Sequence, residues 1–317
     1  MNEGLPISDF DVFYISYDEP LCESYWADLR LHAPWAKRVH GVKGFDKAHK
    51  SCAEWSRTDR FITVDGDNLV DDSFFWEQLV IMTQHKDFVF SWGGNNVVNG
   101  LIYGNGGLKC WTRETVMAMR SHEAAVNDTS KVDFCWDLSY VQMRNSYSKV
   151  YPNGTPYQAF RAGFREGVKM SLDRGRRVEP YRLTTKLWKG NIDRLRIWCS
   201  VGADVPNGLW CIYGARLGAY MTNLTDWDFA SIADYDWFKS FWETEIVPKF
   251  AGREETCDIS CYRWSRTKLI AEIESLGKDI RAGLNLPITL YNSEASSFFK
   301  STYINPERTG VLTPEEA

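Results

Sequence analysis

The chain has 317 residues, 44% of them hydrophobic and 25% charged, and a formal net charge of −5. This length allows one large domain or two modest ones with a buried core, and the composition excludes a low-complexity chain. The acidic balance does not by itself indicate a nucleic-acid partner. Residues 1–6 lack the features of a signal peptide, and no stretch approaches the roughly 18 apolar residues of a membrane span. We therefore expect a soluble, cytoplasmic protein.

The first half of the chain alternates strand-like and helix-like segments. This alternation predicts an α/β domain, with a Rossmann-like, mainly parallel sheet flanked by helices on both faces. In such sheets ligands bind at the carboxyl ends of the strands, where Asp18 and Asp65 are expected. The predicted strands are 11–16, 36–42, 60–65 and 88–92, and the predicted helices are 21–31, 45–56 and 72–82.

The second half is predicted to be mostly helical and contains no internal repeat. We place the boundary near residue 155, with a nucleotide-binding domain at 1–155 and a helical region at 156–317. The predicted helices cover residues 156–173, 185–201, 207–221, 234–250 and 264–281.

Asp65-Gly66-Asp67-Asn68 directly follows an apolar strand. Two carboxylates that flank a glycine can converge on one hard cation, and the glycine permits a tight turn. The alternative is a solvated acidic turn. An EF-hand loop is excluded because Val70 and Trp76 occupy the positions that need Gly and Glu.

Residues 43–54 and 58–67 together carry a glycine, a helix of small residues and a strand that ends in Asp-x-Asp. This order resembles GT-A glycosyltransferases, especially the family-2-like members, over roughly residues 10–140. The resemblance implies a nucleotide-sugar donor, Mn²⁺ or Mg²⁺ bound by Asp65 and Asp67, and a nucleoside contact at Asp18 or Glu19. No late histidine is present as a third metal ligand, so inverting and retaining chemistry both stay open.

Further donor-binding residues are expected on both sides of this motif. Lys43 and His49, on or near the helix before Asp65, are candidates for contacts to the donor phosphates, and a surface charge cluster is the alternative. The glycine-rich stretch 104–111 matches neither a dinucleotide fingerprint nor a Walker A loop. In GT-A enzymes such a stretch lies beside the donor sugar, which makes Gly106 and Gly107 candidates, and a plain β-turn is the alternative.

Asp133 and Asp137 follow at the place where inverting GT-A enzymes carry their catalytic carboxylate. The reaction needs a base that removes the proton of the acceptor hydroxyl. Residues four apart share one helical face, so either carboxylate fits this role, with Asp137 preferred. The alternative for Asp133 is a helix cap.

A basic segment, 161–196, contains eleven Lys or Arg and four Asp or Glu residues, so its charge is +7 and the rest of the chain carries −12. This asymmetry suggests a polyanionic partner, and a basic face that is solvated or packed on the chain's own acidic parts is the alternative. Tyr181 and Trp188 interleave the basic residues and can stack on bases. The candidate acceptor-binding residues are Arg161, Arg165, Lys169, Arg176, Arg177 and Trp188.

Residues 39–44, 64–67 and 159–167 resemble glycosyltransferases encoded by T4-like bacteriophages. The resemblance implies a UDP-sugar donor, 5-hydroxymethylcytosine in phage DNA as acceptor, and the host cytoplasm as location. Three alternatives stay open: a polysaccharide, lipopolysaccharide or protein acceptor, a nucleotidyltransferase, and a non-catalytic GT-A-like binding module.

Overall fold

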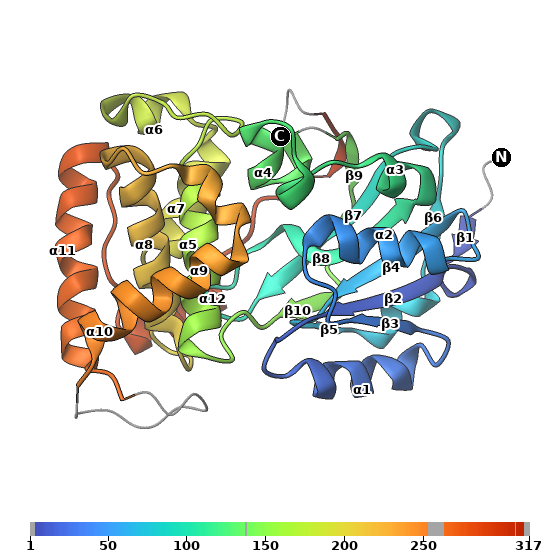
Figure 1. Ribbon diagram of the computed structural model, residues 1–317, viewed down its shortest axis with the longest axis horizontal. Coiled ribbons are helices and arrows are strands. Elements are labelled where there is room, and N and C mark those ends of the chain that lie inside the picture. The colour runs from blue at the N-terminus through green and yellow to red at the C-terminus, as the bar shows by residue number, and fades with distance from the viewer. Residues whose placement is uncertain (1–3, 137, 253–262, 308, 314–317) are drawn as a thin grey trace. The chain divides into compact units, whose positions relative to one another are not determined.

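The computed structural model describes residues 4–136, 138–252, 263–307 and 309–313 (Figure 1). The chain forms two compact units. The first contains residues 1–151 and 304–317, and the second contains residues 152–303. The C-terminal residues thus return to the first unit, which the sequence-based division at residue 155 did not anticipate. Within the described residues, no helix combines the length and the apolar character that crossing a membrane requires.

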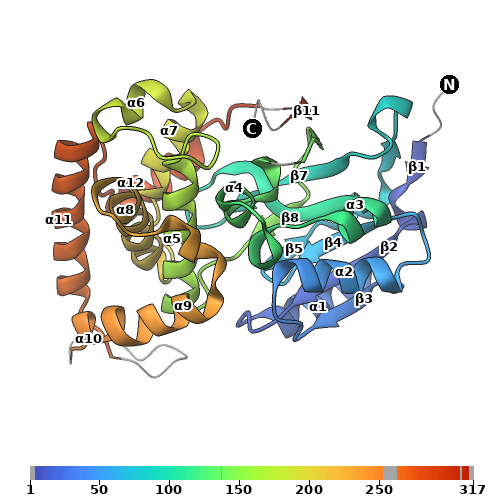
Figure 2. The same cartoon turned by 45° about the horizontal axis from the view of Figure 1, so that its top comes forward.

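The first unit is built on a mixed sheet with the order β11-β9-β7-β8-β4-β2-β3, in which β10 additionally pairs with β5 and β7. The predicted α/β class is confirmed, but a mainly parallel sheet was wrong, because β8 runs antiparallel to both of its neighbours. The edge strand β11 (Gly310–Leu312), labelled in Figure 2, pairs antiparallel with β9. The other strands are β2 (Asp11–Ser16), β3 (Lys37–His40), β4 (Arg60–Asp65), β5 (Asn68–Val70), β7 (Val89–Asn96), β8 (Ile102–Thr112), β9 (Tyr140–Gln142) and β10 (Ser148–Val150).

The central strands bury side chains on both faces because both faces of the sheet are covered. Val12 and Tyr14 of β2 belong to the hydrophobic cluster that contains Leu29 of α1 (Cys22–His32). Phe13, between them, belongs to the other cluster, which contains Cys52 of α2 (Phe45–Trp55). Successive side chains of a strand point to opposite faces, so α1 and α2 cover opposite sides of the sheet, as Figure 1 shows.

The predicted helix at 72–82 is wrong. Residues Asp72–Trp76 form a single 3₁₀ turn, capped by the Asp71 side chain, and β6 (Gln78–Val80) follows. β6 pairs antiparallel with β1 (Gly4–Pro6) in a separate two-stranded sheet, which buries Leu79 and leaves Val80 exposed. The strand hydrogen bonds come from a segment more than 70 residues away in sequence, a partner that local periodicity does not reveal.

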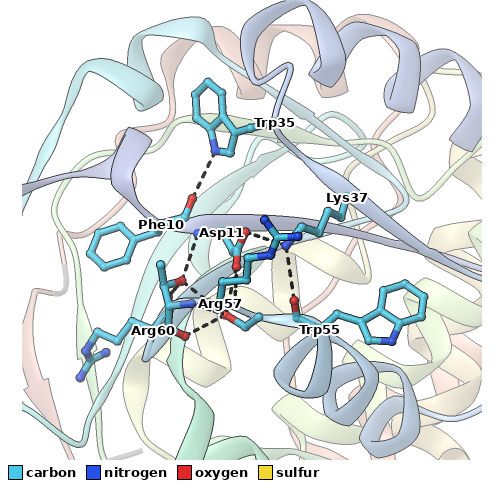
Figure 3. A network of polar contacts seen from close by, with 9 residues as sticks. Phe10, Asp11, Trp35, Lys37, Trp55, Arg57 and Arg60 are labelled. Atoms are coloured by element: carbon cyan, nitrogen blue, oxygen red, sulfur yellow. Dashed lines mark hydrogen bonds and ion pairs between the residues drawn. The ribbon is translucent and has the colours of Figure 1, made fainter.

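Asp11 organises the edge of the sheet at which β2, β3 and β4 begin (Figure 3). Its carboxylate accepts from Lys37 Nζ at 2.8 Å and from the Arg57 backbone amide at 2.5 Å, and its own amide donates to Thr58 Oγ1. Lys37 Nζ also donates to Trp55 O at the end of α2. Burial raises the pKa of Asp11, but the hydrogen bonds and the charge of Lys37 outweigh it and lower the pKa below its usual value.

The second unit is helical. The long helices α5 (Pro156–Met170), α8 (Gly208–Leu224) and α11 (Arg266–Leu284) lie close to their predicted positions. The predicted helix at 185–201 is divided at Leu187 and Trp188 into two shorter helices. The helix at 293–302 was not predicted. The shorter helices are α6 (Leu183–Lys186), α7 (Lys189–Trp198), α9 (Tyr235–Phe241), α10 (Val247–Phe250) and α12 (Ser293–Thr302), and a π-helical turn (Trp242–Ile246) joins α9 to α10.

Glycines let α5 and α8 pack with their backbones in contact. A Cβ on Gly163 or Gly167 would clash with the carbonyl groups of Cys211 or Ala215, and a Cβ on Gly214 would clash with Phe160 O. Gly163 lies against Cys211, and Gly167, one turn later in α5, lies against Ala215, one turn later in α8. The two helices therefore run parallel. The close approach is possible only because no side chain separates the helices.

We expect Gly214→Ala to lower the free energy of unfolding by about 2–3 kcal/mol, because its methyl group overpacks a backbone contact and alanine's higher helix propensity only partly compensates. Urea unfolding followed by circular dichroism measures the change. Ser275→Ala, at an exposed position of α11, is the control and should stay within about 0.5 kcal/mol of the parent chain. Equal stability of the two variants would contradict the proposed contact.

We expect Asp11→Asn to lower the free energy of unfolding by about 1–3 kcal/mol near neutral pH, because it removes a charge-assisted acceptor. The folded-state pKa of Asp11 is lowered, so its stabilisation is full above the unfolded-state pKa of about 4 and is lost as the pH falls through the folded-state pKa. The difference between parent and variant should therefore shrink below pH of about 4 in urea titrations. A difference independent of pH would argue against this role, and Asp279→Asn serves as the exposed control.

Candidate functional site

The carboxyl ends of β2 and β4 meet at a reversal of the strand order. β3 pairs parallel with one side of β2, and β4 pairs parallel with the other. Ligands of open α/β sheets bind in the crevice at such a switch point. The turn Tyr17–Glu19 follows β2, and Asp65, Gly66 and Asp67 end or follow β4. The structure therefore brings four predicted residues, Asp18, Glu19, Asp65 and Asp67, to one edge of the sheet.

Buried groups fix the turn between Asp65 and Asp67. The hydroxyl of Tyr14, a fully buried residue of β2, lies 2.8 Å from Gly66 O and 3.0 Å from the Cys22 O at the start of α1. The Tyr151 amide donates to Asp67 O at 2.8 Å. The contact of Tyr14 with Gly66 O and the hydrogen bond of Tyr151 to Asp67 O thus hold two successive carbonyl groups of the turn.

Glycine is required in the middle of this turn. A Cβ on Gly66 would lie 2.6 Å from Glu19 Oε2 and 3.0 Å from Ile15 O. Glu19 is itself held in place, because its carboxylate accepts from the Tyr17 amide at 2.7 Å. The absence of a side chain at Gly66 thus allows a third carboxylate to approach the turn between Asp65 and Asp67.

Burial is the main cause that raises the pKa of Asp65, and the negative charge of Glu19 raises it further. Lys109 of β8, which is itself buried, acts in the opposite direction and lowers this pKa. Two carboxylates therefore share a region with one buried cation. An additional cation there would relieve the repulsion between them.

The glycine-rich stretch 104–111 is part of strand β8, so the alternative of a plain β-turn does not describe it. Gly107 has φ +68°, and a Cβ on it would lie 2.7 Å from Asp65 Oδ2 and 2.5 Å from Asn68 Nδ2. Gly107 thus lies directly against the Asp65 carboxylate, as glycine alone permits. Gly106 precedes it within β8.

The oxygen atoms around Asp65 are of the kind that Mg²⁺ and Mn²⁺ prefer. Asn68 Nδ2 donates to Asp67 Oδ1 at 3.1 Å, while the buried Asn68 Oδ1 has no hydrogen-bond partner in the described part of the chain. Among the described residues, no three His, Cys, Asp or Glu side chains form a complete metal-binding group. These residues fit a cation held by one or two carboxylates, with substrate phosphates and water completing its coordination.

Two tyrosines next to Asp67 were missed by the sequence analysis. The rings of Tyr25 from α1 and Tyr151 after β10 lie 5.5 Å apart. Burial, then Tyr151 and then the charge of Asp67 raise the pKa of Tyr25 to about 12. Tyr151 joins the site only because β10 pairs with β5, the strand that follows the acidic turn. No local pattern in the sequence indicates this pairing.

His49 lies in the packing between α2 and the sheet, so the expected contact to phosphates is not possible in this arrangement. Its ring is buried, at 4.0 Å from the ring of Phe45 and 5.3 Å from that of Trp111. Burial lowers its pKa to about 4, which leaves it neutral at pH 7. Lys43 is exposed. The first amides of α2 are occupied by Glu123, whose carboxylate accepts from the Phe45 amide at 3.0 Å.

Asp133 lies beyond α4 (Asp128–Val132), which ends before it, so the expected helical face does not form at this residue. Asp133 has extended backbone with φ −157°, is buried, and accepts from the Cys135 amide at 3.3 Å. It follows α4 and directly precedes the 3₁₀ turn Phe134–Trp136, whose Cys135 amide its side chain caps, so the helix-cap alternative describes it. Asp137 lies outside the described residues, so its predicted role stays a prediction.

Three of the predicted acceptor-binding residues have their contacts within the second unit. The guanidinium of Arg161 lies over the rings of Tyr157 and Tyr235, at 5.6 and 5.2 Å from their centroids. Arg165 donates to Ile232 O at 2.5 Å. Lys169 forms a buried ion pair with Glu166, with 2.9 Å between Nζ and Oε1. Lys169 thus packs on an acidic residue, as the alternative has it, whereas Arg161 and Arg165 contact aromatic rings and a backbone carbonyl.

The other three predicted acceptor-binding residues lie nearer the surface. Arg176 is exposed. Arg177 is exposed as well, but it donates to Trp227 O. Trp188 is 46% exposed, with the guanidinium of Arg194 at 5.2 Å from its ring centroid. Basic side chains of one sequence segment thus divide into a buried or half-buried group and an exposed group.

The described residues bring Glu19, Asp65, Asp67 and Asn68 together at the switch point of the sheet, with Gly107 and Lys109 of β8 beside them. They do not bring His49 there. Comparison of the chain with protein-family models, with curated protein sequences and with solved structures gave no match.

Proposed function

We propose that the chain is a metal-dependent glycosyltransferase that moves a sugar from a UDP-sugar to an acceptor hydroxyl. The observation that carries the proposal is the position of Asp65 and Asp67 at the switch point, where Gly66 and Gly107 leave room for the carboxylates of Glu19 and Asp65. A pyrophosphate with a divalent cation is a ligand that this edge of an α/β sheet and this set of oxygen donors suit.

Each residue of the site has a distinct role in this proposal. Asp65 and Asp67 would hold Mn²⁺ or Mg²⁺. The cation would neutralise the charge of the pyrophosphate and the charge that develops on the departing UDP. Lys109 favours the ionised form of Asp65. The Tyr14 hydroxyl and the Tyr151 amide keep the turn in place without further rearrangement. Tyr25 and Tyr151 offer ring surface next to Asp67.

The proposed acceptor is the 5-hydroxymethyl group of modified cytosine in DNA, with the cytoplasm as the location. The excess of positive charge in residues 161–196 supports a polyanionic acceptor. The base that removes the hydroxyl proton is assigned to Asp137, with Asp133 as the second candidate.

We expect Asp65→Asn and Asp67→Asn each to lower the rate of UDP release at least about a hundredfold with Mn²⁺ present, because each removes a metal ligand that offsets charge in the transition state. UDP-sugars are assayed singly, and mass spectrometry tests whether hydroxymethylated DNA gains one sugar. Asp87→Asn, at an exposed position, is the matched control and should keep the activity.

Unfolding is not expected to explain the loss, because Asp65→Asn removes a charge that burial disfavours, and its thermal midpoint should equal or exceed that of the parent. Full activity of both variants would refute the metal role. Hydrolysis of a UDP-sugar without transfer to DNA would refute the DNA acceptor, and no turnover of any donor would favour a binding module.

A further inference from the structure

A strained turn presents an arginine at the surface of the second unit. Asp173 and Arg176 exchange backbone hydrogen bonds of 2.8 and 2.9 Å, which close a two-residue turn. Both central residues, Arg174 and Gly175, have positive φ, at 49° and 73°. Asn-Gly is the relaxed sequence for such a turn, whereas arginine is strained there.

The turn opens a segment, residues 173–189, in which charge and aromatic surface alternate. It contains six Lys or Arg and two Asp or Glu residues, so its charge is +4. Tyr181 is 72% exposed, and Trp188 is 46% exposed. Figures 1 and 2 both show α6, the centre of this segment, at the margin of the helical unit. The exposed basic side chains are Arg174, Arg176, Arg177, Lys186 and Lys189.

Internal contacts hold the segment in place. Leu183 and Leu187 are buried. The Arg177 guanidinium donates to Trp227 O and lies 5.4 Å from the ring centroid of Phe229. The six-membered ring of Trp188 lies against Gly190, where a Cβ would displace it. A ligand would therefore meet a segment whose backbone is already held in place, which lowers the entropy cost of binding.

We propose that residues 173–189 bind single-stranded nucleic acid, with phosphates at Arg174, Arg176, Lys186 and Lys189 and bases stacked on Tyr181 and Trp188. Cations alternating with exposed rings match a chain in which phosphates alternate with flat bases, and the rings distinguish this ligand from a purely charged polyanion. The inference deepens the proposed function, because it assigns the surface for a nucleic-acid acceptor.

The test is fluorescence anisotropy of labelled single-stranded DNA with the full chain, without donor or metal, so that its result is independent of sugar transfer. Arg174→Asn should weaken binding about three- to tenfold and lower the salt slope by about 0.7, the value for one phosphate contact on a single strand. Its thermal midpoint should rise, because asparagine fits the turn. Arg174→Lys keeps the charge and should retain most of the affinity.

A triple variant, Arg174→Asn with Arg176→Gln and Lys186→Gln, should lose at least about thirtyfold in affinity. The matched control carries Lys86→Gln, Arg113→Gln and Lys239→Gln at exposed positions elsewhere. Tyr181→Ala should weaken binding with the salt slope unchanged, since stacking releases no counterions. The proposal would be overturned if the two triple variants bound DNA equally well, or if the parent chain bound no DNA. It would also be overturned if heparin competed for the labelled DNA as well as unlabelled single-stranded DNA does. Each outcome would count whether or not UDP-sugar turnover is found.

Discussion

The candidate site depends on one buried hydroxyl. Tyr14 lies on β2, between β4 and the edge strand β3, and its oxygen contacts Gly66 O and Cys22 O. It thereby connects β2, the beginning of α1 and the acidic turn after β4. A buried carbonyl group without a partner is costly, so the turn has little freedom to move away from Tyr14. The positions of Asp65 and Asp67 follow from this restriction, and Gly66 and Gly107 are the residues that such crowding demands.

Much of the first unit could be predicted because its signals are local. Strands at 11–16 and 60–65 are short apolar runs, and a strand that ends in Asp65 places a carboxylate at the sheet edge. The missed features depend on distant partners. β8 contains several glycines and forms because β4 and β7 flank it. β6 forms because β1 pairs with it. Neither the glycine content of β8 nor the helical periodicity of residues 72–82 reveals these pairings with distant strands.

The same distinction applies to the basic residues. A charge count correctly identifies a segment with an excess of cations, but it does not show which of these side chains make contacts within the protein. Arg161 and Arg165 have helical spacing and yet contact Tyr157, Tyr235 and Ile232 O. Aromatic side chains and helix-end carbonyls are common partners of arginine, and they come from sequence positions that periodicity does not connect.

The parallel arrangement of α5 and α8 affects which parts of the sequence can vary during evolution. α5 is about 22 Å long, so the chain must travel back over that length before α8 can begin. Residues 171–207 make this return, and the exposed cations and rings proposed to bind nucleic acid lie within it. Because the glycine contacts between α5 and α8 are made by other residues, substitutions in the returning segment leave that contact intact. Selection for a different partner could therefore act on this segment while the helical core is conserved.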